Sequence, residues 1–100
     1  MTIEGALCSI APTVSDWGQI EIILSDAVKQ ASSLEDFVQW LESQDCIQSV
    51  DLTDYLVKTC PPLRELNVVF LMEDKSLCQK IIDVAVLADH SLQFHKLRER

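Results

Sequence analysis

The spacing of apolar residues changes near Asp45, and this change limits the fold more than any other feature of the chain. Between Asp16 and Gln44, apolar residues recur at alternating steps of three and four, which places them on one face of an α-helix. They are Trp17, Ile20, Leu24, Ala27, Ala31, Leu34, Val38 and Leu41. After Asp45 the chain is rich in Val, Leu, Thr, Tyr and Phe, which suit a pleated sheet. A helical first part and a β second part are therefore predicted.

The helical stripe is long enough to form either one helix or two. One helix of about 28 residues would be about 42 Å long, whereas a compact chain of this size has a radius of gyration of about 13 Å. Ser32-Ser33 offers a break, because Ser33 can cap a new helix with Asp36 three residues later. We predict two helices, about 15–31 and 33–44. A single long helix in a dimeric coiled coil is the alternative.

Two strands are expected around Pro61-Pro62, which exclude a helix there and favour an extended residue before them. Their predicted ranges are about 50–59 and 64–72. In the second strand, alternate apolar residues face the same side of the sheet. These are Leu66, Val68, Phe70 and Met72.

The segment from Glu73 to Leu97 can be read as a helix over 75–88 or as strands separated by tight turns. Its β-branched run disfavours a helix, and an Asp-x-Ser pattern recurs on both sides of Leu77–Leu87. We therefore predict strands, with turns at Asp74-Lys75 and Asp89-His90. Lys75 and His90 must then adopt positive φ.

The predicted fold class is α+β, an N-terminal helical pair packed on a C-terminal antiparallel four-stranded meander. All 100 residues are expected to form a single domain, with the helical part over about 15–44 and the sheet over about 47–97. The first dozen residues are expected to add a short edge strand around Ala6–Ile10 or to be loose.

Four cysteines, Cys8, Cys46, Cys60 and Cys78, form no C-x-x-C pair. With an apolar fraction of 48%, the chain does not need disulfides to build a core. We expect all four cysteines to be small buried hydrophobic residues. No basic N-terminal region or long apolar run indicates a signal or a membrane segment, so the predicted location is cytoplasmic.

No sequence motif indicates catalysis or a cofactor. No G-x-S-x-G is present, and the two glycines exclude a standard phosphate-binding loop. Asp89, His90 and His95 are the nearest candidates for a metal site. On a hairpin, however, the two histidines would lie about 17 Å apart at about 3.4 Å per residue. Exposed histidines, no metal, no cofactor and no enzymatic activity are therefore expected.

Negative charge is concentrated in the first half of the chain. The net charge is −8; residues 1–50 carry eight acids and one base, and residues 51–100 carry eight acids and seven bases. This balance argues against nucleic-acid or anionic-membrane partners. The predicted acidic helical face, which would steer a basic partner protein, consists of Glu21, Asp26, Glu35, Asp36 and Glu42. An ordinary solvated face is the alternative.

The sheet is predicted to carry more apolar side chains than two helices can cover. Tyr55, Val57, Val69 and Leu71 would lie on its outer face, where a homodimer through sheet faces or edges would bury them. The C-terminal Lys96, Arg98 and Arg100 could meet acidic residues of a neighbour, or form an ordinary charged tail.

These patterns predict a small, non-enzymatic protein–protein interaction module, homodimeric, which presents its acidic helical face to a partner. The alternative is a carrier of small apolar ligands, with a pocket between helices and sheet. That pocket would be lined by Trp17, Phe37, Trp40 and Phe70, although the tryptophans on the helical stripe favour core packing. Mimicry of a nucleic-acid surface by the acidic helices ranks third.

Overall fold

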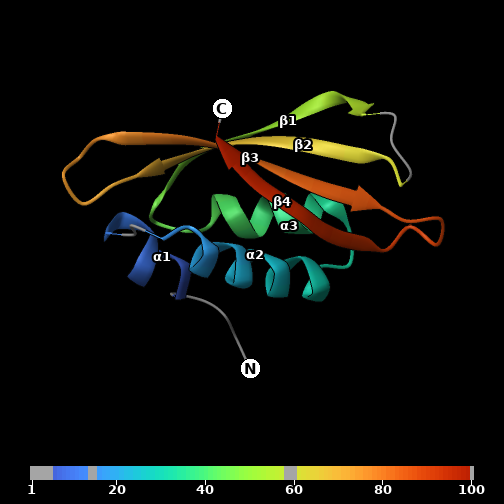
Figure 1. The fold of residues 1–100 in the computed structure, drawn as a ribbon, viewed down its shortest axis with the longest axis horizontal. Coiled ribbons are helices and arrows are strands. Elements are labelled where there is room, and N and C mark those ends of the chain that lie inside the picture. The colour runs from blue at the N-terminus through green and yellow to red at the C-terminus, as the bar shows by residue number, and fades with distance from the viewer. Residues whose placement is uncertain (1–5, 14–15, 58–60, 100) are drawn as a thin grey trace.

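The computed structural model describes residues 6–13, 16–57 and 61–99, with the backbone alone for Ala6 and for 54–57. All the helices lie on one side of a four-stranded antiparallel sheet, so the molecule has two layers (Figure 1). The sheet order β1-β2-β3-β4 is a simple meander. The predicted α+β class is therefore confirmed. No helix in the described ranges has the length and hydrophobicity needed to span a bilayer.

Two helices form the predicted helical part, and the break lies where the sequence indicated it. α2 spans Gly18–Gln30 and α3 spans Leu34–Glu42. Asp16 Oδ1 accepts a hydrogen bond from the N–H of Gly18 (3.0 Å) at the start of α2. Ser33 has an extended backbone and accepts a hydrogen bond from the N–H of Asp36 (3.1 Å), which is the N-cap interaction that begins α3. The single long helix is thereby excluded.

The N-terminal segment differs from its prediction. Instead of an edge strand or a loose end, it forms a short helix, α1, over Ala6–Ile10, followed by a 3₁₀ turn, η1, over Ala11–Thr13. Leu7 and Ala11 are completely buried. The strand prediction failed because this segment packs on the face of the sheet, where it makes no strand hydrogen bonds.

The four strands agree closely with the predicted ranges. β1 spans Ile47–Val57, β2 Leu63–Leu71, β3 Leu77–Val86 and β4 Leu92–Glu99. In β2, Leu66, Val68 and Phe70 are buried and face the helices, as the alternation predicted. The sheet face that carries these three side chains is called the inner face below, and the opposite side is called the outer face.

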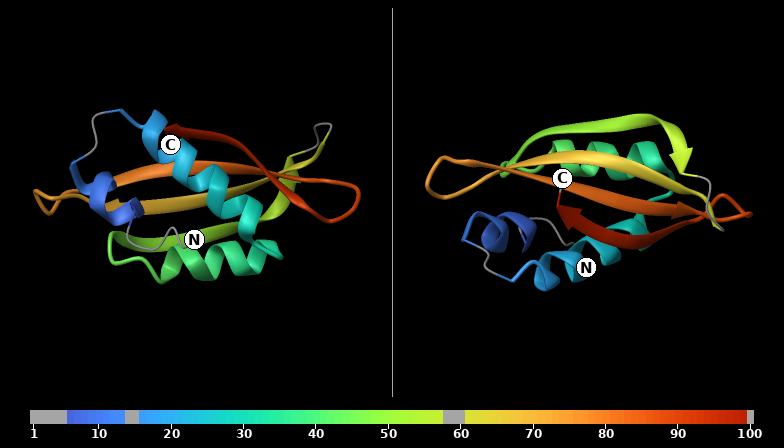
Figure 2. Two further views of the ribbon diagram at one scale, coloured as in Figure 1. Left: turned by 90° about the horizontal axis from the view of Figure 1, so that it is seen from below. Right: turned by 45° about the horizontal axis from the view of Figure 1, so that its top comes forward.

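The helices divide the inner face between them. α2 packs against β4 and α3 packs against β1, so the two helices diverge from their junction in a V (Figure 2). The core between the layers is built from both helices and all four strands. Its largest fully buried side chains outside α1 are Phe37, Phe70, Ile20, Leu24, Leu41, Leu66 and Ile82.

Two similar turns connect β2 to β3 and β3 to β4. In the first, the N–H of Met72 bonds to the carbonyl of Ser76, and the N–H of Lys75 bonds to the carbonyl of Met72. Leu87, Ser91 and His90 repeat this pattern in the second turn. Each loop thus holds three residues, and its last residue is left-handed, with φ 70° at Lys75 and 68° at His90.

An aspartate fixes each of these loops. Asp74 Oδ1 accepts hydrogen bonds from the hydroxyl and the N–H of Ser76, and Asp89 does the same for Ser91. These hydrogen bonds lower the pKa of both aspartates. The recurring Asp-x-Ser pattern therefore reports a real structural repeat, and the predicted positive φ values are confirmed.

A glycine in place of Lys75 or His90 should be accepted, whereas a β-branched residue should not. We expect Lys75→Gly or His90→Gly to change the free energy of unfolding by between zero and about +1 kcal/mol, because relief of the left-handed strain is offset by glycine entropy. His90→Val should cost about 1–2 kcal/mol. Urea unfolding followed by circular dichroism measures both. Equal stability of the valine and glycine variants would contradict the turn geometry.

Candidate functional site

The carboxylates of the predicted acidic face come from both α2 and α3. Glu35, Asp36 and Glu42 lie on α3 and are exposed. On α2, Asp26 is half-buried, and the half-buried Glu21 accepts a hydrogen bond from the N–H of Leu97 at 3.4 Å. Glu21 is therefore turned toward β4, and the most accessible carboxylates are those of α3.

A groove of about 240 Å³ lies where the two helices meet. The last turns of α2 form one wall and the first turns of α3 the other. The lining residues are Ala27, Gln30, Ala31, Asp36, Phe37 and Trp40. Phe37 is fully buried and stacks nearly parallel to the half-exposed Trp40, with ring centroids 6.1 Å apart. The groove is therefore mainly apolar, with one carboxylate at its edge.

The other pair of aromatic residues fills the space between helix and sheet. Trp17 packs edge-on against Phe70, with ring centroids 5.2 Å apart. The ammonium group of Lys80 lies 4.5 Å from the Trp17 ring centroid and pairs with Glu99 at 3.3 Å. Lys80 is almost completely buried, so the cation–π contact and the ion pair compensate for its loss of water. The prediction that the tryptophans pack against the core is confirmed.

On the outer face, a three-residue ion cluster occupies the middle of the sheet. Arg98 on β4 donates to both carboxylate oxygens of Asp83, at 2.7 and 3.1 Å, and also to the carboxylate of Glu65. The Asp83 side chain is only 6% exposed. Hydrogen bonding to Asp83, opposed by desolvation and helped by the charges of Asp83 and Glu65, raises the pKa of Arg98. Arg98 is thus engaged within its own chain.

The four residues predicted for sheet assembly lie toward two ends of the sheet. Val69 and Leu71 are half-buried near the end of β2. Leu71 pairs with Leu77, whose side chain is 57% exposed. Tyr55 and Val57 lie in β1, and Val57 pairs with Leu63 at the start of β2, but their side chains fall outside the described residues. The ion cluster lies between these two ends.

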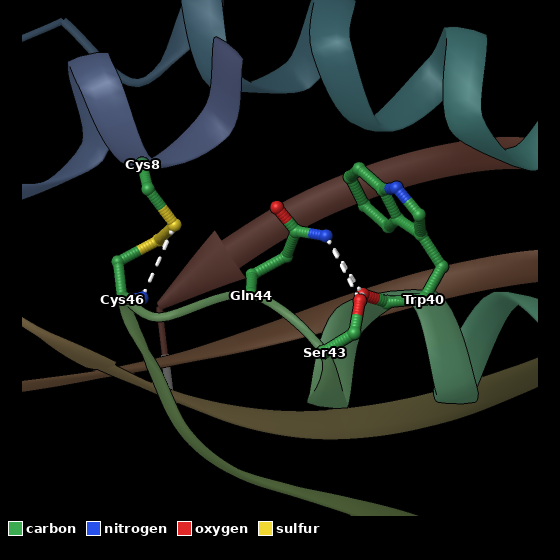
Figure 3. The surroundings of a disulfide bond; sticks show 5 residues. All are labelled: Cys8, Trp40, Ser43, Gln44 and Cys46. Atoms are coloured by element: carbon green, nitrogen blue, oxygen red, sulfur yellow. Dashed lines mark hydrogen bonds between the residues drawn. A yellow bond between two sulfur atoms is a disulfide. The ribbon is translucent and has the colours of Figure 1, made fainter. Parts of the chain in front are cut away.

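The cysteine prediction was wrong for two of the four residues. Cys8 of α1 and Cys46, just before β1, form a disulfide with a Cα–Cα distance of 5.3 Å (Figure 3). The N–H of Cys46 also donates to Cys8 Sγ (3.1 Å). Cys78 is free and half-buried, and Cys60 lies outside the described residues. The pairing was not predicted, because Cys8 and Cys46 lie 38 positions apart in the sequence and only the packing of α1 brings them together.

The three residues considered for a metal site do not come together in the structure. Asp89 and His90 lie in the β3–β4 turn and His95 on β4, and all three are exposed, as expected for the histidines. Within the described part of the chain, no three His, Cys, Asp or Glu side chains are grouped to hold a metal ion.

Comparisons with family models, with curated proteins and with solved structures find no match to this chain. The features that bear on function are therefore the groove, the carboxylates of α3 and the outer face.

Removing the arginine of the outer-face cluster should strongly destabilise the fold. We expect Arg98→Met to lower the free energy of unfolding by about 2–3 kcal/mol, because it leaves the buried Asp83 carboxylate without its cation. Adding Asp83→Val should recover part of this loss, because the buried charge is then gone. Urea unfolding measures both variants, with Lys96→Met as an exposed control that should change stability by less than about 0.5 kcal/mol. A double variant less stable than Arg98→Met would contradict this account.

Proposed function

We propose that this chain is a non-enzymatic protein–protein interaction module whose helical layer binds a basic segment of a partner protein. The observation that carries the proposal is the uneven distribution of ion pairs between the helical layer and the sheet. In the part of the chain that the structure describes, Asp26, Glu35, Asp36 and Glu42 form no ion pair. The sheet, in contrast, uses Arg98 and Lys80 to neutralise its own carboxylates. An uncompensated acidic layer attracts cationic partners and speeds their association.

The groove between α2 and α3 supports the same proposal, because it offers an apolar anchor point beside these charges. Its volume of about 240 Å³ lies below the roughly 300–1,000 Å³ of sites for drug-sized ligands. It suits one bulky apolar side chain, packed against Trp40 and Phe37. A lysine or arginine next to that side chain would reach Asp36 at the edge of the groove.

The carrier alternative receives less support. Phe37 and Phe70 are completely buried, and Trp17 packs on Phe70. Three of the four aromatic residues expected to line an internal pocket therefore fill the core instead, and only Trp40 keeps substantial access to the groove.

Self-association through the outer face of the sheet belongs to the same proposal. We place its centre at Leu77, which is one of two exposed large apolar residues in the described part of the chain, with Leu71 and Val69 beside it. The other exposed residue, Ile22 at 66%, lies on α2 in the opposite layer. A homodimer would thus leave the helical layer available to a partner.

The cytoplasmic location remains a proposal that rests on the sequence, whereas the Cys8–Cys46 bond favours an oxidising compartment. A disulfide that opens and closes in response to the environment would be compatible with both.

The partner-binding proposal predicts affinity for a basic amphipathic peptide. We expect a tryptophan-free synthetic peptide of leucines and lysines in helical spacing to change the fluorescence of Trp40 in a Trp17→Phe background, because Trp40 lines the groove. Glu35→Lys/Glu42→Lys should weaken binding at least about tenfold, which is about 1.4 kcal/mol. Ala31→Leu should also weaken it, because leucine fills the groove.

The matched control for the charge reversal is Asp51→Lys/Glu73→Lys, which makes the same charge change at exposed positions of the sheet layer. It should leave most of the affinity intact. An equal loss of affinity in both double variants would show that the effect comes from net charge alone. Absence of binding by the parent protein would overturn the proposal.

The assembly proposal predicts a dimer at micromolar concentration that depends on Leu77. Leu77→Asp should shift sedimentation velocity toward the monomer, because a charge is then placed in the apolar contact. Ile22→Asp, which introduces the same charge on the helical layer, should leave the dimer unchanged. A strictly monomeric parent protein, or equal effects of the two variants, would contradict assembly through this face.

A further inference from the structure

We propose that the N-terminal segment Ala6–Thr13 is a redox-sensitive latch. The Cys8–Cys46 disulfide holds this segment on the inner side of the sheet, and reduction of the disulfide releases it. The inference rests on the disulfide and its surroundings, and it is independent of the proposed partner and of self-association.

The latch depends on the disulfide because the segment is too short to keep its helix by itself. α1 has five residues, far fewer than the roughly 12–15 that an isolated helix needs to be even marginally stable. Leu7 and Ala11 are buried in the core, and Cys8 and Ile10 pack against it. The N–H of Glu73 bonds to the carbonyl of Pro12 at 3.0 Å. The covalent bond to Cys46 is therefore the strongest link between the latch and the rest of the protein.

The remainder of the fold has a core of its own. Apart from Cys46, the other buried apolar side chains come from α2, α3 and the four strands. The sheet is held together by strand hydrogen bonds that do not involve the latch. Figure 2 shows α1 lying across the wide end of the V, where α2 begins and α3 ends. Release of the latch would open that end and leave both helices on the sheet.

A reductant can reach the disulfide. Cys46 is buried, but Cys8 is half-buried, and both line a solvent-open cavity of about 430 Å³. Asp45 and Glu73 also line this cavity, opposed by Lys75 alone. The acidic wall disfavours anionic thiols, so the reductant indicated is an uncharged or cationic dithiol.

The exchange chemistry is that of a dithiol reductant. Its thiolate attacks Cys8 Sγ, the Cys8–Cys46 bond breaks, and Cys46 leaves as a thiolate that takes up a proton. The second thiol of the reductant then attacks the mixed disulfide and releases Cys8 as a thiolate, which is also protonated. The protein gains two electrons and two protons, and the dithiol becomes a cyclic disulfide.

Reduction would expose apolar surface at one end of the sheet. Leu7 and Ala11 are completely buried in the oxidised protein, and the Glu73–Pro12 hydrogen bond locates the latch next to the β2–β3 turn. When the segment leaves, the inner face near that turn loses its cover. The latch would be closed in an oxidising compartment and open in a reducing cytoplasm.

Hydrogen exchange followed by mass spectrometry tests the latch on the full chain. With the disulfide intact, confirmed by a Cys8–Cys46 cross-linked peptide, residues 7–13 should be protected. After dithiothreitol treatment their exchange should accelerate by at least about tenfold, while Leu66–Phe70 in β2 stays protected. Reoxidation should restore the slow exchange.

Two variants complete the test. Cys8→Ser should show the fast exchange without any reductant, and Cys78→Ser, which leaves the disulfide intact, should behave as the parent protein does. Unchanged protection of 7–13 after reduction, loss of protection throughout β2, or the absence of a Cys8–Cys46 cross-link in the air-oxidised protein would each overturn the proposal.

Discussion

Burial of the inner face of the meander is the constraint on which the rest of the structure depends. Leu66, Val68 and Phe70 form a continuous apolar row along β2, and a single straight helix could not cover both edges of the twisted sheet behind it. The break at Ser32-Ser33 solves this problem, because α2 can follow β4 while α3 follows β1. The groove lies at the junction of the resulting V, and α1 lies across its wide end (Figure 2), where Cys8 bonds to Cys46.

The same two-layer arrangement separates the charges. With no helix on the outer face, Arg98 and its two carboxylates cover the centre of that face. Among the described residues Lys80 is the one buried basic side chain, and it lies between Trp17 and Glu99. These contacts pair two cations with carboxylates of the sheet, whereas the carboxylates of α3 form no ion pair among the described residues. The acidity of the helical layer follows from its composition, because α2 and α3 together carry five acids and one base.

Features set by local chemistry could be predicted from the sequence, and features set by long-range packing could not. The Ser33 cap and the two Asp-x-Ser turns depend on residues a few positions apart, so they were found. The Cys8–Cys46 bond depends on two segments 38 residues apart, and sequence alone cannot tell which of the four cysteines pair. The Arg98 cluster was missed for a related reason, because a register shift between β3 and β4 brings Arg98 to Asp83 and the strand pattern does not reveal it.

The sheet edges are poorly suited to binding other chains, and this directs attention to the two faces. β4 is an edge strand with the exposed residues His95 and Lys96, and the register shift opposite Asp83 and Val84 leaves His95 without a partner in the pairing. Charges and bulges of this kind discourage strand addition. The other edge, β1, has two irregularities in its own pairing. Of the two faces, the outer one is occupied at its centre by ion pairs. The helical layer combines an apolar groove with carboxylates that form no ion pair among the described residues. We therefore propose the helical layer as the surface for a partner that carries both positive charge and an apolar side chain.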